Sequence, residues 1–163
     1  MNLFAIACTA LVPIILGFIW YHPRLFGKIW MREAGLLEEQ IRNSNMLKIL
    51  GLTLLLGFTL AFMMQVLVIH QSHIRSLFYL QPINDPGTEA GALYKKIMDN
   101  YGQSYRTFKH GSFHGTILGF LVIVPVIAIN ALFERKSFKY IAVHAGYWIL
   151  TFALMGGLIS AFA

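Results

Sequence analysis

Residues 111–133 read GSFHGTILGFLVIVPVIAINALF, a stretch without a single Asp, Glu, Lys or Arg. An apolar run of this length is typical of a helix that crosses a bilayer, because about 20 residues at a rise of about 1.5 Å cover the ~30 Å hydrocarbon layer. Backbone groups in that layer must bond one another, so only helices and closed barrels can span it. The stretch lacks the alternation of a barrel strand, and we therefore predict a transmembrane helix.

Three other stretches, residues 3–20, 47–69 and 140–162, are equally apolar, and only the second contains a charged side chain, Lys48, at its edge. We therefore predict an all-α integral membrane protein with four transmembrane helices in an antiparallel bundle. The composition agrees, because 12% of the residues are charged, against ~25% in ordinary soluble domains. Four spans occupy most of the 163 residues, so we expect a single membrane domain over residues 1–163.

The segments between the predicted spans have helical patterns of their own. Residues 25–32 place apolar side chains on one face and Lys28 and Arg32 on another, which predicts a short helix in the cytoplasmic interface. In the long segment 71–109, Thr88 is a candidate N-cap, and Leu93, Ile97 and Tyr101 follow at helical spacing. We expect this segment to form an extracytoplasmic helical cap, folded onto the bundle or the membrane surface.

Basic residues predict the orientation in the membrane. The loops after the first and third predicted spans are short and basic, whereas the five basic residues of the long loop are spread among acids. Cytoplasmic loops are enriched in Lys and Arg, so both short loops are expected in the cytoplasm and both ends of the chain outside. The net charge of +6 is thereby explained by topology and by contact with the lipid bilayer, and we expect no nucleic-acid partner.

Small residues recur on the last two predicted spans. Gly111, Gly115 and Gly119 repeat every four residues, and the fourth span carries Gly146 and Gly157. Glycine faces let helices approach closely, either within one bundle or between protomers of a homo-oligomer or a membrane protein complex. Pro125 should bend the third span.

Four histidines are the candidate chemistry. His70 and His73 are three residues apart at one end of the second span, and His110 and His114 are four apart at the start of the third. Each spacing places a pair on one helical face, and antiparallel neighbouring helices would bring both pairs together. Imidazole is a ligand for Zn, Cu, Fe or Ni, so the four form a candidate transition-metal site, and two of them a candidate haem site.

Tyr94, Tyr101 and Tyr105 lie in the intervening segment, and folded over the imidazoles they would shield such a site. The alternative is that these interfacial histidines only bond carbonyls, lipid headgroups or water.

No enzyme motif is present, neither a phosphate-binding glycine loop nor a G-x-S-x-G or H-E-x-x-H pattern. All seven acids lie outside the predicted spans, whereas a proton- or cation-coupled transporter usually needs an ionisable group inside the membrane. We therefore expect no enzyme. The leading function hypothesis is a structural or interaction (accessory) subunit, followed by a metal- or haem-binding membrane protein and then a small-molecule transporter.

Residues 20–35, WYHPRLFGKIWMREAG, carry the pattern W-Y-x-P-x-x-F-G-K-x-W. With the later stretches around residues 133–138 and 145–147, this pattern resembles the bacterial membrane protein family known as domain of unknown function seventeen sixty-one. The resemblance implies a four-helix protein of the bacterial inner membrane without an assigned activity. The residues that carry it are Trp20, Tyr21, Pro23, Phe26, Gly27, Lys28 and Trp30.

Overall fold

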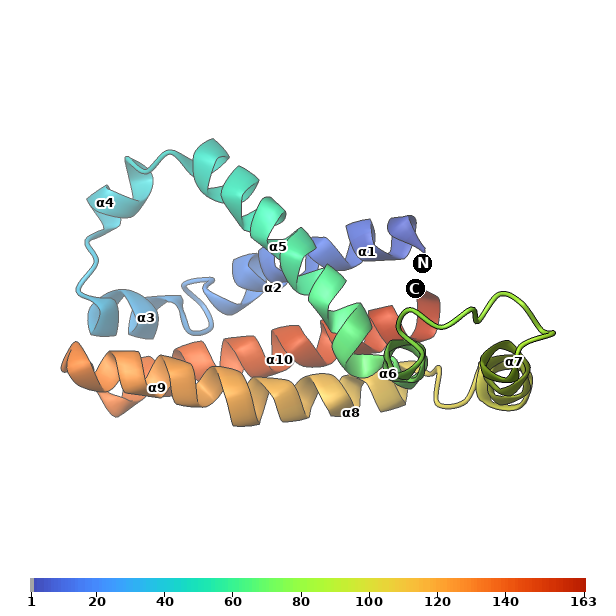
Figure 1. Cartoon of the computed structure of the whole chain (residues 1–163). Coiled ribbons are helices and arrows are strands. Elements are labelled where there is room, and N and C mark those ends of the chain that lie inside the picture. Colours follow the sequence, from blue (N-terminus) through green and yellow to red (C-terminus); the bar gives the residue numbers. More distant parts are fainter. Residues whose placement is uncertain (1) are drawn as a thin grey trace.

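The computed structural model describes residues 2–163, and these residues form helices and loops without a strand (Figure 1). Within residues 2–163, four helical spans are long and apolar enough to cross a membrane. They are Leu3–Trp20, Met46–Val68, Phe108–Phe133 and Phe138–Phe162. The prediction of four apolar helices is therefore confirmed, with ends that shift by a few residues. The third span begins at Phe108 because Thr107 caps it, accepting a hydrogen bond from the His110 amide at 3.2 Å.

The first span consists of two helices, α1 (Leu3–Ala10) and α2 (Val12–Trp20). They are separated at Leu11, whose amide bonds the Cys8 carbonyl at 3.2 Å in a tighter turn. The break follows from Pro13, in the first turn of α2, because proline has no N–H to continue the ladder of the preceding helix.

The third span also departs from a regular helix. It runs through α8 (Phe108–Leu118), a π-helical turn η1 (Gly119–Ile123) and α9 (Val124–Phe133). The wide turn lies directly before Pro125, whose ring cannot tolerate the carbonyl four residues back in a regular α-helix. Where the sequence predicts a bend at Pro125, the structure has a locally wider helical turn.

Helix α10 (Phe138–Phe162) is the central helix, with α8 and α9 along one side and α1 and α2 along another (Figure 1). Helix α5 (Met46–Val68) crosses this group obliquely and diverges from it toward α4 (Glu38–Arg42) (Figure 1). The second half of α5 contributes to the core, which is formed by Ile6, Ala10, Ala61, Met64, Val68, Met155 and Ile159 among others. The arrangement is therefore a three-span group with one inclined helix, more open than the predicted bundle.

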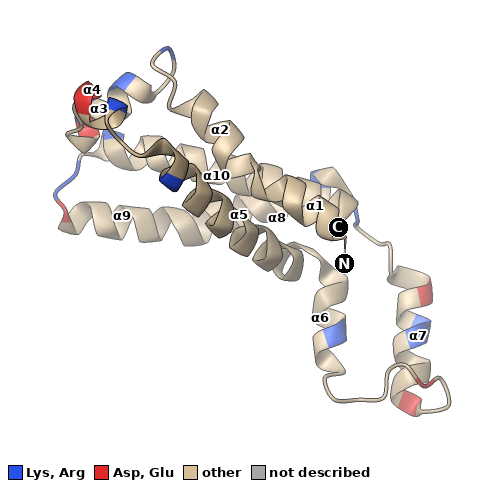
Figure 2. Ribbon diagram, turned by 90° about the horizontal axis from the view of Figure 1, so that it is seen from above, with Lys and Arg blue, Asp and Glu red and all other residues tan. Residues whose placement is uncertain are grey.

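The charged residues gather at the two ends of the molecule, and the helices between them are largely free of charge (Figure 2). One end carries α3 (Gly27–Ala34), where the sequence predicts a short helix, together with α4. At the other end, α6 (His70–Leu77) and α7 (Glu89–Tyr101) extend beyond the spans as an arm (Figure 2).

The arm differs from the predicted cap. Thr88 does cap α7, accepting a hydrogen bond from the Gly91 amide at 3.1 Å. Leu93 and Tyr101, however, are exposed on α7, so the apolar stripe is not folded onto the bundle, and its contact with the membrane surface stays a prediction.

Candidate metal centre

The break between α5 and α6 sets the position of His70. Ile69 lies between α5 and α6, and its backbone is extended, with φ −100° and ψ 107°. His70 is the first residue of α6 and therefore lies where the chain turns toward the start of α8. Its Nε2 atom is 2.9 Å from Nε2 of His110.

His110 and His114 belong to the first turns of α8, and their spacing of four residues places them on one face. Their Nε2 atoms are 3.1 Å apart. The cap by Thr107 fixes the start of this helix, and with it the position of His110 in the first turn. Both residues are half-buried, and the ligand atoms of all three histidines lie within 4.8 Å of one another.

Three converging imidazole nitrogens match the requirements of one metal ion. In a tetrahedral site with bonds of ~2.0–2.1 Å, the ligand nitrogens are about 3.3 Å apart. The two separations that involve His110, 2.9 Å and 3.1 Å, are close to that value, and all three ligand atoms lie within 4.8 Å of one another. Each neutral imidazole nitrogen carries either a proton or a lone pair. Without an ion, the single Nε2 atom of His110 would have to form the hydrogen bonds to both His70 and His114. A shared ion would instead accept a lone pair from each of the three nitrogens.

Tyr105 covers this group. Its ring stacks on His110 with centroids 4.9 Å apart and meets the edge of His70 at 5.9 Å. The backbone of Tyr105 is left-handed, with φ 63°, an uncommon conformation for a non-glycine residue. Its carbonyl accepts a hydrogen bond from the Ser160 hydroxyl at 3.3 Å, which ties the loop to α10.

Arg106 also ties this loop to α10. Its guanidinium donates to the Ser160 carbonyl at 2.9 Å and to the Ala163 carbonyl. Burial in this position lowers the pKa of Arg106. The sequence gives no signal that Arg106 or Ser160 forms these contacts, because the contacts depend on where the end of α10 lies in the folded protein.

The remaining residues of the predicted site lie elsewhere. His73 is exposed on α6 and outside the group of three, because α6 turns away from α8 after its first residue (Figure 2). Tyr101 is exposed, and Tyr94 packs against Phe78 with ring centroids 5.7 Å apart. The expectation that three tyrosines cover the histidines is therefore wrong for Tyr94 and Tyr101.

The glycines of α8 bring this helix into backbone contact with α10. A Cβ atom at Gly111 would collide with the Gly156 carbonyl, and one at Gly115 with the Phe152 carbonyl. A Cβ at Gly119 would lie 2.9 Å from Cα of Ile149. These faces are occupied within the chain, so packing between protomers would have to use other surfaces.

The two glycines predicted on the fourth span have different neighbours. A Cβ at Gly157 would collide with Ser112 and Phe108 of α8, whereas one at Gly146 would lie 2.9 Å from Cζ2 of Trp20. The residue that directly faces Gly111 is Gly156, which the four-residue spacing on α8 does not reveal.

The residues of the W-Y-x-P-x-x-F-G-K-x-W pattern connect the first span to α10 at the opposite end of the molecule. The Trp20 indole donates to the Val143 carbonyl at 3.0 Å and packs on Phe26, with ring centroids 4.4 Å apart. A Cβ at Gly27 would collide with the Tyr21 carbonyl, so glycine permits the tight turn between these helices.

Tyr21 also contacts α10 at this end of the molecule. Its hydroxyl is 3.0 Å from Nδ1 of His144, and its ring lies 5.0 Å from that of Trp30. Burial, followed by the nearby Tyr147 and Tyr140, raises the pKa of Tyr21. Pro23 and Lys28 are exposed at the edge of the motif.

A family model described as "Protein of unknown function (DUF1761)" matches residues 4–160 of the chain. No curated protein and no solved structure matches it significantly. The match extends over all four spans and over the three histidines.

Proposed function

The chain belongs to the DUF1761 family, and from that premise we propose that it is a multi-pass membrane protein that binds one transition-metal ion through His70, His110 and His114. The observation that carries the proposal is the convergence of three Nε2 atoms from two separate helices, at 2.9 Å and 3.1 Å. Neutral imidazole suits Zn, Cu, Ni and Fe. Three nitrogen ligands also leave a fourth position for water or another small ligand, as in open zinc sites.

A compact ion fits this group better than haem. Two histidines that ligate haem iron approach from opposite faces of a wide ring, whereas the Nε2 atoms of His70 and His110 point at one spot only 2.9 Å apart. Tyr105 on the outer side further narrows the space. We propose binding or sensing of the ion as the role of this group, whose ligands in the described residues are three histidines.

The test is a Co²⁺ titration of chelator-stripped protein in detergent, followed by visible absorption. We expect saturation near one ion per chain for the parent and for His73→Ala, which removes a neighbouring histidine outside the group. His110→Ala should weaken binding by roughly 100-fold or more, since the loss of even an indirect supporting contact costs 10–100-fold. Equal binding by His110→Ala and the parent would refute the site.

We also infer that the histidines face the extracytoplasmic side of a bacterial inner membrane. The short basic segments around α3, α4 and the α9–α10 turn support a cytoplasmic position for the opposite end. An ion taken from outside the cytoplasm would reach the site without crossing the membrane.

An accessory role in a membrane complex is the second candidate, and the α6–α7 arm favours it. The arm extends beyond the spans and exposes Leu77, Leu80, Leu93 and Tyr101. A photo-crosslinking residue at position 93 should capture a partner protein or a second copy of the chain in cells, whereas one at position 51, on the open face of α5, should not. Equal yields at both positions would argue against a docking role for the arm.

A further inference from the structure

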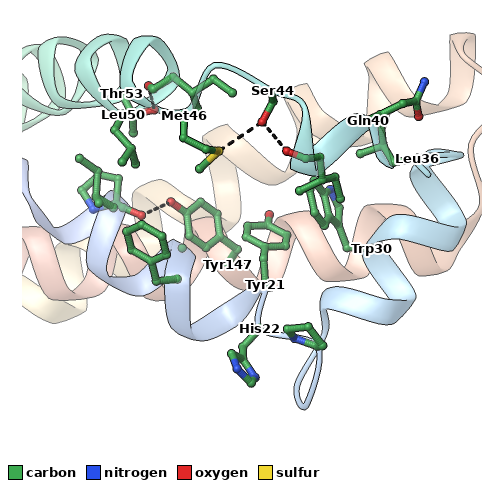
Figure 3. A pocket seen from close by; sticks show the side chains of 17 residues that line it. Tyr21, His22, Trp30, Leu36, Gln40, Ser44, Met46, Leu50, Thr53 and Tyr147 are labelled. Atoms are coloured by element: carbon green, nitrogen blue, oxygen red, sulfur yellow. Dashed lines mark hydrogen bonds between the residues drawn. The ribbon is translucent and has the colours of Figure 1, made fainter. Parts of the chain in front are cut away.

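A cavity of about 690 Å³ lies at the end of the molecule opposite the histidines. Its walls come from α2, α3, α4 and the first half of α5, with Tyr147 of α10 at its base (Figure 3). It exists because α5 inclines away from α2 on its way from α4, leaving a wedge between the two helices (Figure 1). The volume is within the ~300–1,000 Å³ of typical ligand pockets.

The part of the cavity wall contributed by α2 and α5 is suited to hydrocarbon. Pro13, Ile14, Phe18, Ile49 and Leu50 line it. The hydroxyls that also line it are bonded to backbone carbonyls: Tyr147 donates to Pro13 at 2.7 Å, and Thr53 to Ile49 at 2.8 Å. An occupant of this part gains from burial of apolar surface.

The cavity also has polar lining residues. Gln40, Ser44 and His22 line it, and exposed cations lie next to lining residues in the sequence. Arg42 follows Ile41, Lys48 precedes Ile49, and Arg24 follows Pro23. In the part of the chain that the structure describes, none of these three cations is in an ion pair. With Lys28 they outnumber the two acids of α4, Glu38 and Glu39.

We propose that this cavity holds one anionic phospholipid of the surrounding leaflet, with an acyl chain between α2 and α5 and its phosphate at Arg42 and Lys48. An apolar lining with exposed cations in the flanking sequence complements a lipid of this kind. The cavity lies between α2 and α5, which belong to two of the membrane-spanning segments, so a lipid reaches it laterally from the bilayer. Cations near a membrane surface each favour anionic headgroups, which selects this occupant over a neutral one.

The experiment is native mass spectrometry of the full chain after delipidation and incubation with mixed vesicles of phosphatidylglycerol and phosphatidylcholine. The parent should retain one lipid per chain, with a preference of roughly tenfold or more for phosphatidylglycerol, from two cations. Leu50→Trp fills the cavity and should abolish retention. Arg42→Gln with Lys48→Gln should retain a lipid but lose the preference.

The matched control is Lys95→Gln with Lys96→Gln, which removes two cations from α7 at the far end of the molecule and should leave the preference unchanged. Co²⁺ binding by each variant reports that the chain is folded and separates this proposal from the metal site. Absence of retained lipid in the parent, retention by Leu50→Trp, or selection of a neutral lipid would each overturn it.

Discussion

His70 and His110 place their Nε2 atoms 2.9 Å apart although 40 residues separate them in the chain. The extended Ile69 turns His70 toward α8, and the Thr107 cap starts α8 early enough to include His110. Two local features of the backbone, a helix break and a helix cap, thus create a contact between side chains from different spans.

Gly115→Ala should destabilise the protein, because its Cβ would collide with the Phe152 carbonyl on α10. Overpacking of this kind costs about 1–3 kcal/mol. The measurement is the thermal unfolding midpoint in detergent, where the variant should melt several degrees below the parent.

Gly51→Ala is the matched control for this substitution. Gly51 also lies within a helix, but a Cβ there would meet nothing within 4 Å. Its midpoint should be unchanged or raised, since alanine stabilises a helix by about 1 kcal/mol relative to glycine. Equal midpoints for the two variants would mean that α8 and α10 are not in backbone contact.

Glu33→Gln should destabilise the protein at neutral pH and have no effect in acid. The Ser137 hydroxyl donates to Glu33 Oε2 at 2.5 Å, and Arg32 pairs with Oε1 at 2.7 Å. These contacts, that of Ser137 first, lower the pKa of Glu33 below its ordinary value of 4.5. A lowered folded-state pKa stabilises the fold above pH 4.5, and this contribution is lost as the pH falls through the folded-state value.

The measurement is the unfolding midpoint of parent and variant from pH 7 down to the acid limit of the detergent. The difference should be constant above pH 4.5 and shrink below it. Glu39→Gln, at an exposed position of α4, serves as the control and should track the parent. A difference for Glu33→Gln that persists unchanged in acid would rule out the carboxylate as its cause.

Single cysteines at positions 43 and 85 should report opposite sides of the membrane. In a Cys8→Ala background, Asp85→Cys should react with an impermeant thiol reagent in intact cells, and Asn43→Cys should react only after lysis, because the basic loops are expected in the cytoplasm. Labelling of position 43 alone in intact cells would invert the orientation.

Sequence patterns predicted the four spans because length and the absence of charge determine them directly. The break at Leu11 could also be predicted, since Pro13 inside an apolar stretch lacks the N–H that would continue a single helix. The inclination of α5 could not, because it depends on the close crossing where Gly57 meets the backbone of Ala10, far away in the sequence.

The candidate site was predictable only in part. Helical spacing correctly places His110 and His114 on one face, and the antiparallel connection brings His70 near them. The same spacing places His73 beside His70, but the extended Ile69 redirects α6 and leaves His73 exposed. No pattern in the sequence marks the left-handed backbone of Tyr105, which depends on the anchor formed with Ser160 and Arg106.

The metal content of the purified protein tests the central claim most directly. Plasma mass spectrometry of the parent and of His73→Ala, purified without chelator, should give about one transition-metal ion per chain, and His70→Ala combined with His110→Ala should give almost none. Parent protein without stoichiometric metal, even after incubation with Zn²⁺, Cu²⁺ or Ni²⁺ and removal of the excess, would contradict the account.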